Sequence, residues 1–303
     1  VTIVTGFLGS GKTTLLNRAL RAPAFARAAV VVNEFGAIGI DHDLVERSDD
    51  AVVLLENGCL CCGVKGDLVT ALGRLFERGG GAAFDRVVVE TSGLAEPGPI
   101  ADLLGAVPSL RSRYVLAGIV TTVDAVNGAA TLEAHDSALR QVALADRIVI
   151  TKADMLPPGV RAAEVDALTR RLSALNPSAD CRMAGADDAE SFLRAFAEPE
   201  SSRAPAAAFD RRFRHAAHGA GRVRHASIVR DEPLDPQAVE LFLQALERAA
   251  GPKLLRVKGI LNVAGRPDGP AVLNCAQQLV HRVAWLDRWP GTDRRSRLVV
   301  LAM

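Results

Sequence analysis

Short runs of apolar, mostly β-branched residues alternate with segments of helical periodicity over the first 175 residues. Continuously apolar runs of this length are typical of strands that are buried on both faces of a sheet. We expect such strands at Val1–Val4, Ala29–Val32, Ala51–Leu55, Arg86–Glu90, Val115–Val123 and Arg147–Thr151. The segments between them predict helices over Lys12–Leu20, Gly66–Arg78, Pro99–Leu104, Thr131–Leu144 and Gly159–Leu175. This alternation predicts an α/β fold with a mostly parallel sheet covered by helices.

The pattern changes in the last third of the chain. Residues 187–220 are rich in Ala, Arg, Ser and His and poor in large apolar residues, which indicates a linker or an exposed excursion. Three strands and one helix are expected beyond it, at Val223–Val229, Leu254–Val263, Arg297–Leu301 and Pro236–Ala249. We therefore expect two domains, residues 1–203 with the parallel sheet and residues 204–303 with a smaller α+β fold.

Composition narrows the class of protein. With 49% hydrophobic and 23% charged residues the chain is typical of a globular protein. It has no apolar run of about 18 residues, so no membrane span is expected. Three of the five cysteines fall within four residues, which is a poor disulfide framework. The first apolar run leads directly into a glycine-rich motif and leaves no segment for a signal peptide, so we expect a reducing, cytoplasmic location.

Charge is unevenly distributed although the net charge is only +1. Residues 204–303 carry 16 Lys and Arg against 9 Asp and Glu, whereas residues 1–203 carry 20 against 26. The simple interpretation is two differently charged solvated surfaces; the alternative is that the basic part binds an acidic partner. Nucleic acid is not expected as a partner, because the basic residues are not interleaved with the few aromatic ones.

The glycine-rich motif GFLGSGKTT at residues 6–14 satisfies the Walker A pattern. It follows a predicted strand and opens a predicted helix, which is the context in which backbone N–H groups and a helix N-terminus bind phosphate. Lys12 is expected to reach the β- and γ-phosphates and the Thr13 hydroxyl to ligate magnesium. The residues expected to surround the nucleotide phosphates are Gly9, Ser10, Gly11, Lys12, Thr13 and Thr14.

A second predicted strand ends in a carboxylate, Glu90, followed by Thr-Ser-Gly. At the carboxyl end of its strand Glu90 would lie beside the phosphate loop, where it can hold the magnesium shell or orient the attacking water. The backbone of Gly93 can approach the γ-phosphate because glycine has no Cβ. We therefore assign Lys12, Glu90 and Gly93 to catalysis, and Thr13 with Glu90 to magnesium.

The nucleotide base is expected at Thr151, Lys152 and Asp154, which follow another buried strand. An Asp carboxylate accepts two hydrogen bonds from N1–H and the 2-amino group of guanine, whereas adenine presents an acceptor there. The Lys152 stem can lie over the base. This is the Asn-Lys-x-Asp guanine motif with Thr in its first position, and it favours GTP over ATP.

Cys59, Cys61 and Cys62 form a compact thiol cluster. Thiolates suit zinc, copper(I) or cobalt-type ions, and three of them leave one tetrahedral position open. The alternatives are small buried apolar residues and a redox-active thiol group. Residues 33–67 lie in the interval where GTPases keep segments that respond to the γ-phosphate, so hydrolysis could change metal affinity. His215, His218 and His225 form a looser cluster, for which a solvated segment is preferred over metal binding.

The ordered motifs together resemble the CobW family of metallochaperone GTPases. The resemblance is carried by GFLGSGKTT, Asn33–Gly36, the ENGCLCC motif of residues 56–62, ETSGLAEP of residues 90–97 and Thr151–Asp154. Leu255–Gly259, Asp287–Pro290 and Arg294–Leu298 are similar to the family's second domain, so the resemblance covers essentially the whole chain.

This resemblance implies a GTPase of the SIMIBI class that delivers zinc or cobalt to a client metalloprotein. The metal would be carried by the Cys-x-Cys-Cys motif, with Glu34 as an assisting ligand. Two alternatives are kept: a P-loop kinase of a small molecule, which would release a phosphorylated product, and a metal buffer without enzyme activity. The sequence leaves the oligomeric state open, a homodimer included.

Overall fold

The computed structural model describes residues 1–32, 52–54, 64–77, 84–185, 223–250, 253–276, 279–280, 283–289 and 291–303. These residues form two compact units, the first built on a seven-stranded sheet and the second on an antiparallel sheet. Each unit is considered separately below. None of the described helices is both long enough and apolar enough to cross a membrane.

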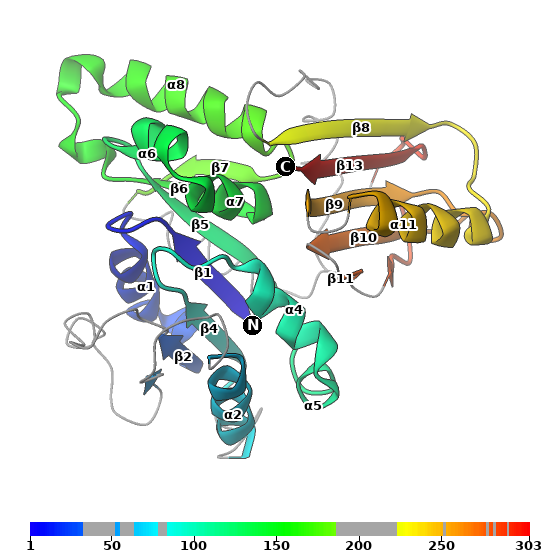
Figure 1. The fold of residues 1–303 in the computed structure, drawn as a ribbon, viewed down its shortest axis with the longest axis horizontal. Coiled ribbons are helices and arrows are strands. Elements are labelled where there is room, and N and C mark those ends of the chain that lie inside the picture. The colour runs from blue at the N-terminus through cyan, green and yellow to red at the C-terminus, as the bar shows by residue number, and fades with distance from the viewer. Residues whose placement is uncertain are drawn as a thin grey trace. The chain divides into compact units, whose positions relative to one another are not determined.

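The first unit is organised around a sheet of strand order β3-β2-β4-β1-β5-β6-β7 (Figure 1). Pairing is parallel from β3 to β6. The strand bounds are β1 Thr2–Gly6, β2 Ala28–Val32, β3 Val52–Leu54, β4 Arg86–Glu90, β5 Gly118–Asp124, β6 Arg147–Thr151 and β7 Asp180–Met183. The predicted parallel α/β sheet is therefore confirmed, with β7 as an additional edge strand.

Helices cover both faces of this sheet. Helix α1 packs its leucines on the face that carries Val4 and Val120, whereas the Thr121 hydroxyl on the opposite face donates to the Gln141 carbonyl of α7. The helical bounds are α1 Lys12–Leu20, α2 Val64–Glu77, α4 Gly98–Ala106, α5 Pro108–Arg111, α6 Gly128–Ala134, α7 Asp136–Leu144 and α8 Pro158–Leu175, with short 3₁₀ turns η1 Pro23–Phe25 and η3 Ala153–Met155.

The prediction of one continuous helix over residues 131–144 is wrong, because the structure has two helices there. The segment 131–144 is not a single helix, because His135 adopts an extended conformation, with φ −129° and ψ 115°, between α6 and α7. His135 is the N-cap residue of α7, and Asp136 follows in the first turn, where a negative charge is favoured by the helix dipole. The break gives α7 its own N-terminus.

Four neighbouring strands bring the predicted nucleotide motifs to one edge of the sheet. Strands β4, β1, β5 and β6 are adjacent and parallel, with Val4 opposite Glu90, Gly6 opposite Thr122 and Asp124 opposite Thr151. Because parallel strands end at the same edge, the segments that follow these strands meet there.

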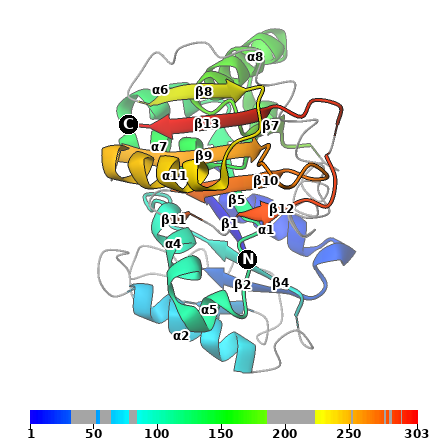
Figure 2. The same ribbon diagram turned by 90° about the vertical axis from the view of Figure 1, so that its right-hand side faces the viewer.

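The second unit is a small antiparallel sheet with one helix packed on it (Figure 2). Apolar residues of α11, including Val239, Leu243 and Leu246, pack against a core that contains Val257 and Leu298. The element bounds are β8 Arg224–Arg230, α11 Pro236–Ala250, β9 Leu254–Leu261, β10 Ala271–Ala276, β11 Leu279–Val280, β12 Ala284–Trp285 and β13 Ser296–Ala302. The α+β prediction is confirmed, and β10 to β12 are additions to it.

The predicted linker and the predicted domain boundary between residues 203 and 204 lie outside the described residues. The boundary therefore stays a prediction.

Candidate functional site

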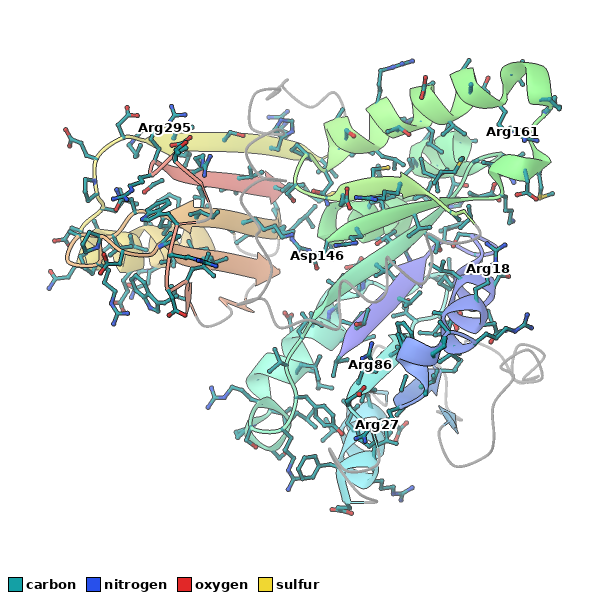
Figure 3. The ribbon with its side chains drawn as sticks, turned by 180° about the vertical axis from the view of Figure 1, so that it is seen from behind. Arg18, Arg27, Arg86, Asp146, Arg161 and Arg295 are labelled. Carbon is teal, nitrogen blue, oxygen red and sulfur yellow. The ribbon has the colours of Figure 1, made fainter. Side chains whose placement is uncertain are left out.

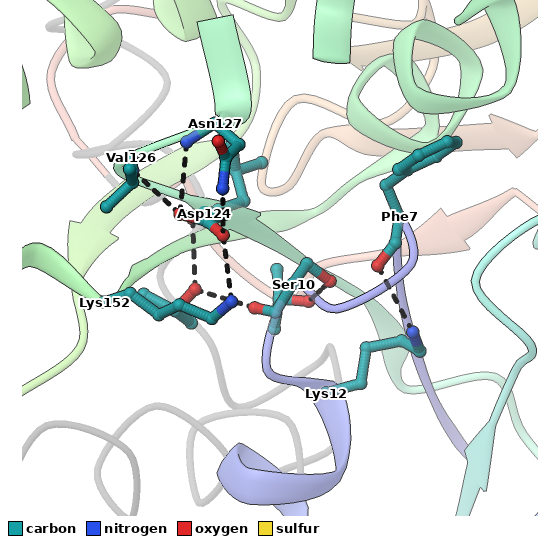
Figure 4. Close-up of polar contacts among 10 residues, drawn as sticks. Phe7, Ser10, Lys12, Asp124, Val126, Asn127 and Lys152 are labelled. Carbon is teal, nitrogen blue, oxygen red and sulfur yellow. Dashed lines mark hydrogen bonds and ion pairs between the residues drawn. The ribbon is translucent and has the colours of Figure 1, made fainter. Parts of the chain in front are cut away.

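The predicted phosphate loop connects β1 to α1 and enters the helix through a left-handed glycine. Gly11 is the N-cap residue of α1 and lies in the left-handed region, with φ 88°, which glycine adopts without steric cost. The Ser10 N–H donates to the Phe7 carbonyl at 3.0 Å, which closes the loop on itself. The Lys12 ammonium donates to the same carbonyl at 3.4 Å and is 8% exposed (Figure 4). Lys12 therefore lies folded back over the loop.

Hydroxyl groups of two neighbouring strands anchor this loop. The Ser10 and Thr122 hydroxyl oxygens are 2.6 Å apart, and the Thr151 hydroxyl donates to the Ser10 carbonyl at 2.7 Å. All three residues are buried. Thr151, which the sequence assigned to the base, thus also supports the phosphate loop from β6.

Glu90 lies directly beside the first turn of α1. The Thr13 hydroxyl donates to Glu90 Oε1 at 2.6 Å, across 77 positions of sequence, and Glu90 is 1% exposed. The pairing of β4 with β1 continues one residue beyond Glu90, because the Thr91 N–H donates to the Val4 carbonyl at 2.9 Å. Both partners of this contact offer hard oxygen atoms, which is the donor type that magnesium prefers. The residues present therefore fit the predicted magnesium site.

The loop after Glu90 is in close contact with the phosphate loop. A Cβ on Gly93 would lie 2.7 Å from both the Cα and the backbone nitrogen of Leu8. Because a real Cβ does not come that close to backbone, only glycine fits at this position. The structure thus brings Gly93 to the phosphate loop, as its assignment to catalysis requires.

At the end of β6 the chain turns sharply at Lys152, whose φ is 56°. Its ammonium donates to Asp124 Oδ2 at 2.9 Å, and Asp124 Oδ1 accepts from the Val126 and Asn127 backbone N–H groups (Figure 4). Burial alone raises the pKa of the Asp124 carboxyl, but the bond from Lys152 and those from residues 126 and 127 outweigh it and lower the pKa below 3.8. Asp124 is therefore charged at neutral pH and fixes Lys152.

Asp154 follows two residues after Lys152, on the 3₁₀ turn η3, and is exposed. The turn is supported by Arg161 of α8, labelled in Figure 3, whose guanidinium donates to the carbonyls of Asp154 and Leu156 at 2.9 and 3.0 Å. Thr151, Lys152 and Asp154 thus lie at the sheet edge that also carries the phosphate loop. The geometry is compatible with base recognition by Asp154.

Behind the first half of the phosphate loop there is a cavity of about 160 Å³. It is partly open to solvent and is lined by the loop, the end of β5, Lys152 and helices α6 and α7. Phe7 at the loop stacks on His135, with ring centroids 4.4 Å apart. The N-cap residue of α7 and the phosphate loop are therefore in direct contact.

Two polar residues of this site were missed from the sequence. Asp124 ends a buried strand, which was a signal comparable to that of Glu90, but no motif marked it. Gln141 is buried at 1% exposure in the middle of α7, where the sequence gives no indication of its partners.

The predicted transition-metal ligands Cys59, Cys61, Cys62 and Glu34 lie outside the described residues, as do His215 and His218. Within the part of the chain that is described, no group of three or more His, Cys, Asp or Glu side chains could hold a metal ion. His225 lies on β8, and Cys181 on β7. The metal site therefore stays a prediction.

Both parts of the chain match known protein families. Residues 1–182 match the family model "CobW/HypB/UreG, nucleotide-binding domain", and residues 223–303 match "Cobalamin synthesis protein cobW C-terminal domain". The first match includes strands β1 to β6, and the second includes the antiparallel sheet with α11. They confirm the resemblance that the motifs indicated.

Individual relatives agree with the family match. The zinc chaperone YjiA of Escherichia coli K12 is 31% identical over 305 residues, covering 100% of this chain and 93% of YjiA. The zinc-regulated GTPase metalloprotein activator 1 of Schizosaccharomyces pombe is 38% identical over 163 residues, covering 52% of this chain and 39% of that protein.

A solved structure supports the same assignment. The crystal structure of the Zn(II)-bound YjiA GTPase from E. coli superposes with a TM-score of 0.66 at 25% identity, covering 100% of this chain and 93% of that one. The chain belongs to the CobW/HypB/UreG family and is a P-loop GTPase with a CobW-type C-terminal domain.

Proposed function

We propose that this GTPase is a metallochaperone that binds a transition metal, zinc in preference to cobalt, and delivers it to a client metalloprotein. The relatives named above are a zinc chaperone and a zinc-regulated metalloprotein activator, which supports zinc as the cargo. The ligands we propose are the thiolates of Cys59, Cys61 and Cys62, assisted by Glu34. Thiolate ligation requires a reducing compartment, and we propose the cytoplasm.

The observation that carries the enzymatic half of the proposal is the 2.6 Å hydrogen bond from the partly exposed Thr13 to the buried Glu90. We assign Lys12 to the charge on the β- and γ-phosphates, and Glu90 to orientation of the attacking water. The backbone of Gly93 would line the γ-phosphate position. Magnesium, held by Thr13 and by Glu90 through its hydration shell, would neutralise charge on the phosphates when bound. Asp154 would select guanine, with Lys152 held in place by Asp124.

Strand order supports a link between hydrolysis and metal binding. The predicted ligand segment follows Leu54 of β3, which pairs with β2, and β2 pairs with β4, the strand that ends in Glu90. The segment then leads to α2, which begins at Val64. Because the predicted ligands follow strands of the same sheet in the sequence, we propose that nucleotide state changes metal affinity.

A three-thiolate site also explains release. A closed site of four thiolate or imidazole ligands would retain zinc as a structural ion, whereas here the position beside the three thiolates is supported only by the Glu34 carboxylate, which a client ligand can displace. Transfer then proceeds by ligand exchange, without free zinc in solution. The cysteines must be deprotonated to bind, so loading releases protons.

The experiment that tests this proposal is a zinc competition titration at saturating GTP analogue and at saturating GDP. We expect one zinc per chain and affinities that differ about 5- to 150-fold between the two states, which corresponds to a coupling of about 1–3 kcal/mol. Equal dissociation constants would contradict the coupling and leave metal binding intact.

The cysteines are tested in the same assay. Replacing Cys59, Cys61 and Cys62 by serine should abolish high-affinity binding, whereas Cys181→Ser on β7 is the matched control and should bind as the parent does. If the triple variant retains its affinity, the thiols are not the metal site.

A further inference from the structure

Gln141 is a buried polar residue on the face of α7 that is otherwise apolar. It is 1% exposed, and Ala138 and Val142, three residues before it and one residue after it, are buried apolar residues. Burying an amide is unfavourable unless its groups find hydrogen-bond partners. The partners of Gln141 should therefore indicate what this residue does.

Both N–H groups of the Gln141 amide are used by one loop. Nε2 donates to the Gly93 carbonyl at 3.1 Å and to the Ala95 carbonyl at 2.9 Å. Since both partners are acceptor carbonyls, the amide must present its nitrogen Nε2 to them, because the amide oxygen Oε1 would be repelled. Oε1 has no partner among the described residues. The hydrogen bonds of this side chain thus serve the loop that connects Glu90 to α4.

The same loop is held from its other side by the phosphate loop. Gly93 lies so close to the Leu8 backbone that no Cβ fits between them. The Ala95 N–H donates to the Ser92 carbonyl at 3.1 Å, which closes a tight turn over residues 92–95. This turn is therefore fixed between the phosphate loop and Gln141.

The two bonds from Gln141 also set the direction of backbone donors. In a trans peptide the C=O and the following N–H point in opposite directions. With the carbonyls of Gly93 and Ala95 directed toward α7, the N–H groups of Leu94 and Glu96 are directed away from it. Gln141 therefore determines the orientation of the Gly93–Leu94 and Ala95–Glu96 peptide groups.

We propose that Gln141 is a positioning residue for GTP hydrolysis. It holds the 92–95 turn so that the Gly93 backbone and the Glu90 carboxylate keep the arrangement needed in the transition state, without contacting the nucleotide itself. This inference rests on the roles proposed above for Glu90 and Gly93. Because misplacement of catalytic groups slows the chemical step more than it weakens substrate binding, loss of Gln141 should act on kcat.

Three variants of the full chain test this inference in a steady-state GTPase assay. Gln141→Met keeps the size of the side chain and removes both donors; we expect kcat to fall at least about tenfold and KM to change less than about twofold. Arg140→Ala is the neighbouring control. It removes the partly exposed ion pair with Glu96, 3.4 Å long, and should leave kcat within about twofold of the parent value.

Gln141→Glu tests the positioning role through the pH dependence of kcat, which a purely structural role would not change. As a carboxylate it faces two carbonyls and is repelled, whereas the protonated acid can donate one hydrogen bond; this environment raises its pKa. Its kcat relative to the parent should therefore rise as the pH is lowered from 8 to 6, while that of Gln141→Met should not.

Parental kcat in Gln141→Met, or the absence of any pH-dependent recovery in Gln141→Glu, would overturn the inference. Glu90→Gln separates this failure from failure of the site itself. If Glu90→Gln abolishes hydrolysis and Gln141→Met does not, only the role of Gln141 is wrong. If Glu90→Gln hydrolyses GTP at the parental rate, the assignment of the catalytic site is wrong.

Discussion

The Thr13 hydroxyl donates a 2.6 Å hydrogen bond to Glu90, joining the first turn of α1 to the end of β4. The two residues are far apart in sequence and meet because β1 and β4 are adjacent parallel strands. The Glu90 carboxylate, the Thr13 hydroxyl and the Lys12 ammonium of the phosphate loop therefore lie at the same edge of the sheet. Most of the predictions below test groups at this edge.

Replacing Lys12 by alanine should lower GTP turnover by about 100-fold or more, because a donor to the charge that develops on the phosphates is lost. Arg18→Ala is the matched control, since Arg18 is an exposed cation of the same helix, labelled in Figure 3. Release of inorganic phosphate measures both. Parental turnover in Lys12→Ala would show that the motif at residues 6–14 does not perform the hydrolysis.

Replacing Asp154 by asparagine should weaken GTP binding by at least about tenfold, since an amide cannot accept two hydrogen bonds from guanine. Xanthine carries a carbonyl where guanine carries its amino group, so the variant amide can donate to xanthosine triphosphate. Competition between the two nucleotides for a fluorescent analogue measures the change in preference. An unchanged preference would exclude Asp154 from the base site.

Asp124→Asn tests the ion pair with Lys152 through its pH dependence. The pKa of Asp124 is lowered in the folded chain, so the charge stabilises the fold above pH 3.8 and this contribution is lost as the pH falls through the folded-state pKa. We expect the variant to lose about 1–3 kcal/mol at pH 7 and progressively less below pH 4. Urea unfolding of the parent and the variant at pH values from 7 to below 4 measures this difference in the free energy of unfolding.

Asp85→Asn is the control for this pH series. Asp85 forms an exposed pair with Arg86, 2.9 Å long, and exposed pairs contribute at most about 1 kcal/mol. A destabilisation of Asp124→Asn that is the same at pH 7 and at pH 3.5 would contradict the ionic role of Asp124.

Two glycine-to-alanine substitutions should have opposite effects. Gly93→Ala forces a Cβ against the Leu8 backbone, which should destabilise the fold by about 1–3 kcal/mol and slow GTP hydrolysis. Gly73 lies in α2 with open space at its Cβ position, so Gly73→Ala should stabilise by about 0.5–1 kcal/mol. Thermal unfolding measures both, and a neutral Gly93→Ala would mean that the 92–95 turn can move away from Leu8.

The sequence by itself determined the class of fold and the positions of the nucleotide motifs. Each signal was local: continuous apolar runs for strands, the glycine pattern before α1, and carboxylates at strand ends. Arg86–Glu90 and Arg147–Thr151 were predicted with the bounds that the structure has. Since parallel strands end at one edge, these local signals also indicated that Lys12, Glu90 and Lys152 converge.

Only the tertiary structure decided which buried polar groups pair. The sequence assigned Thr151 to the base, and the structure adds that its hydroxyl donates to the Ser10 carbonyl. Asp124 and Gln141 were not assigned, because their partners, Lys152 and the carbonyls of residues 93 and 95, lie 28 to 48 positions away. A hydrogen bond between distant segments depends on how helices and strands pack, and no periodicity along the chain encodes it.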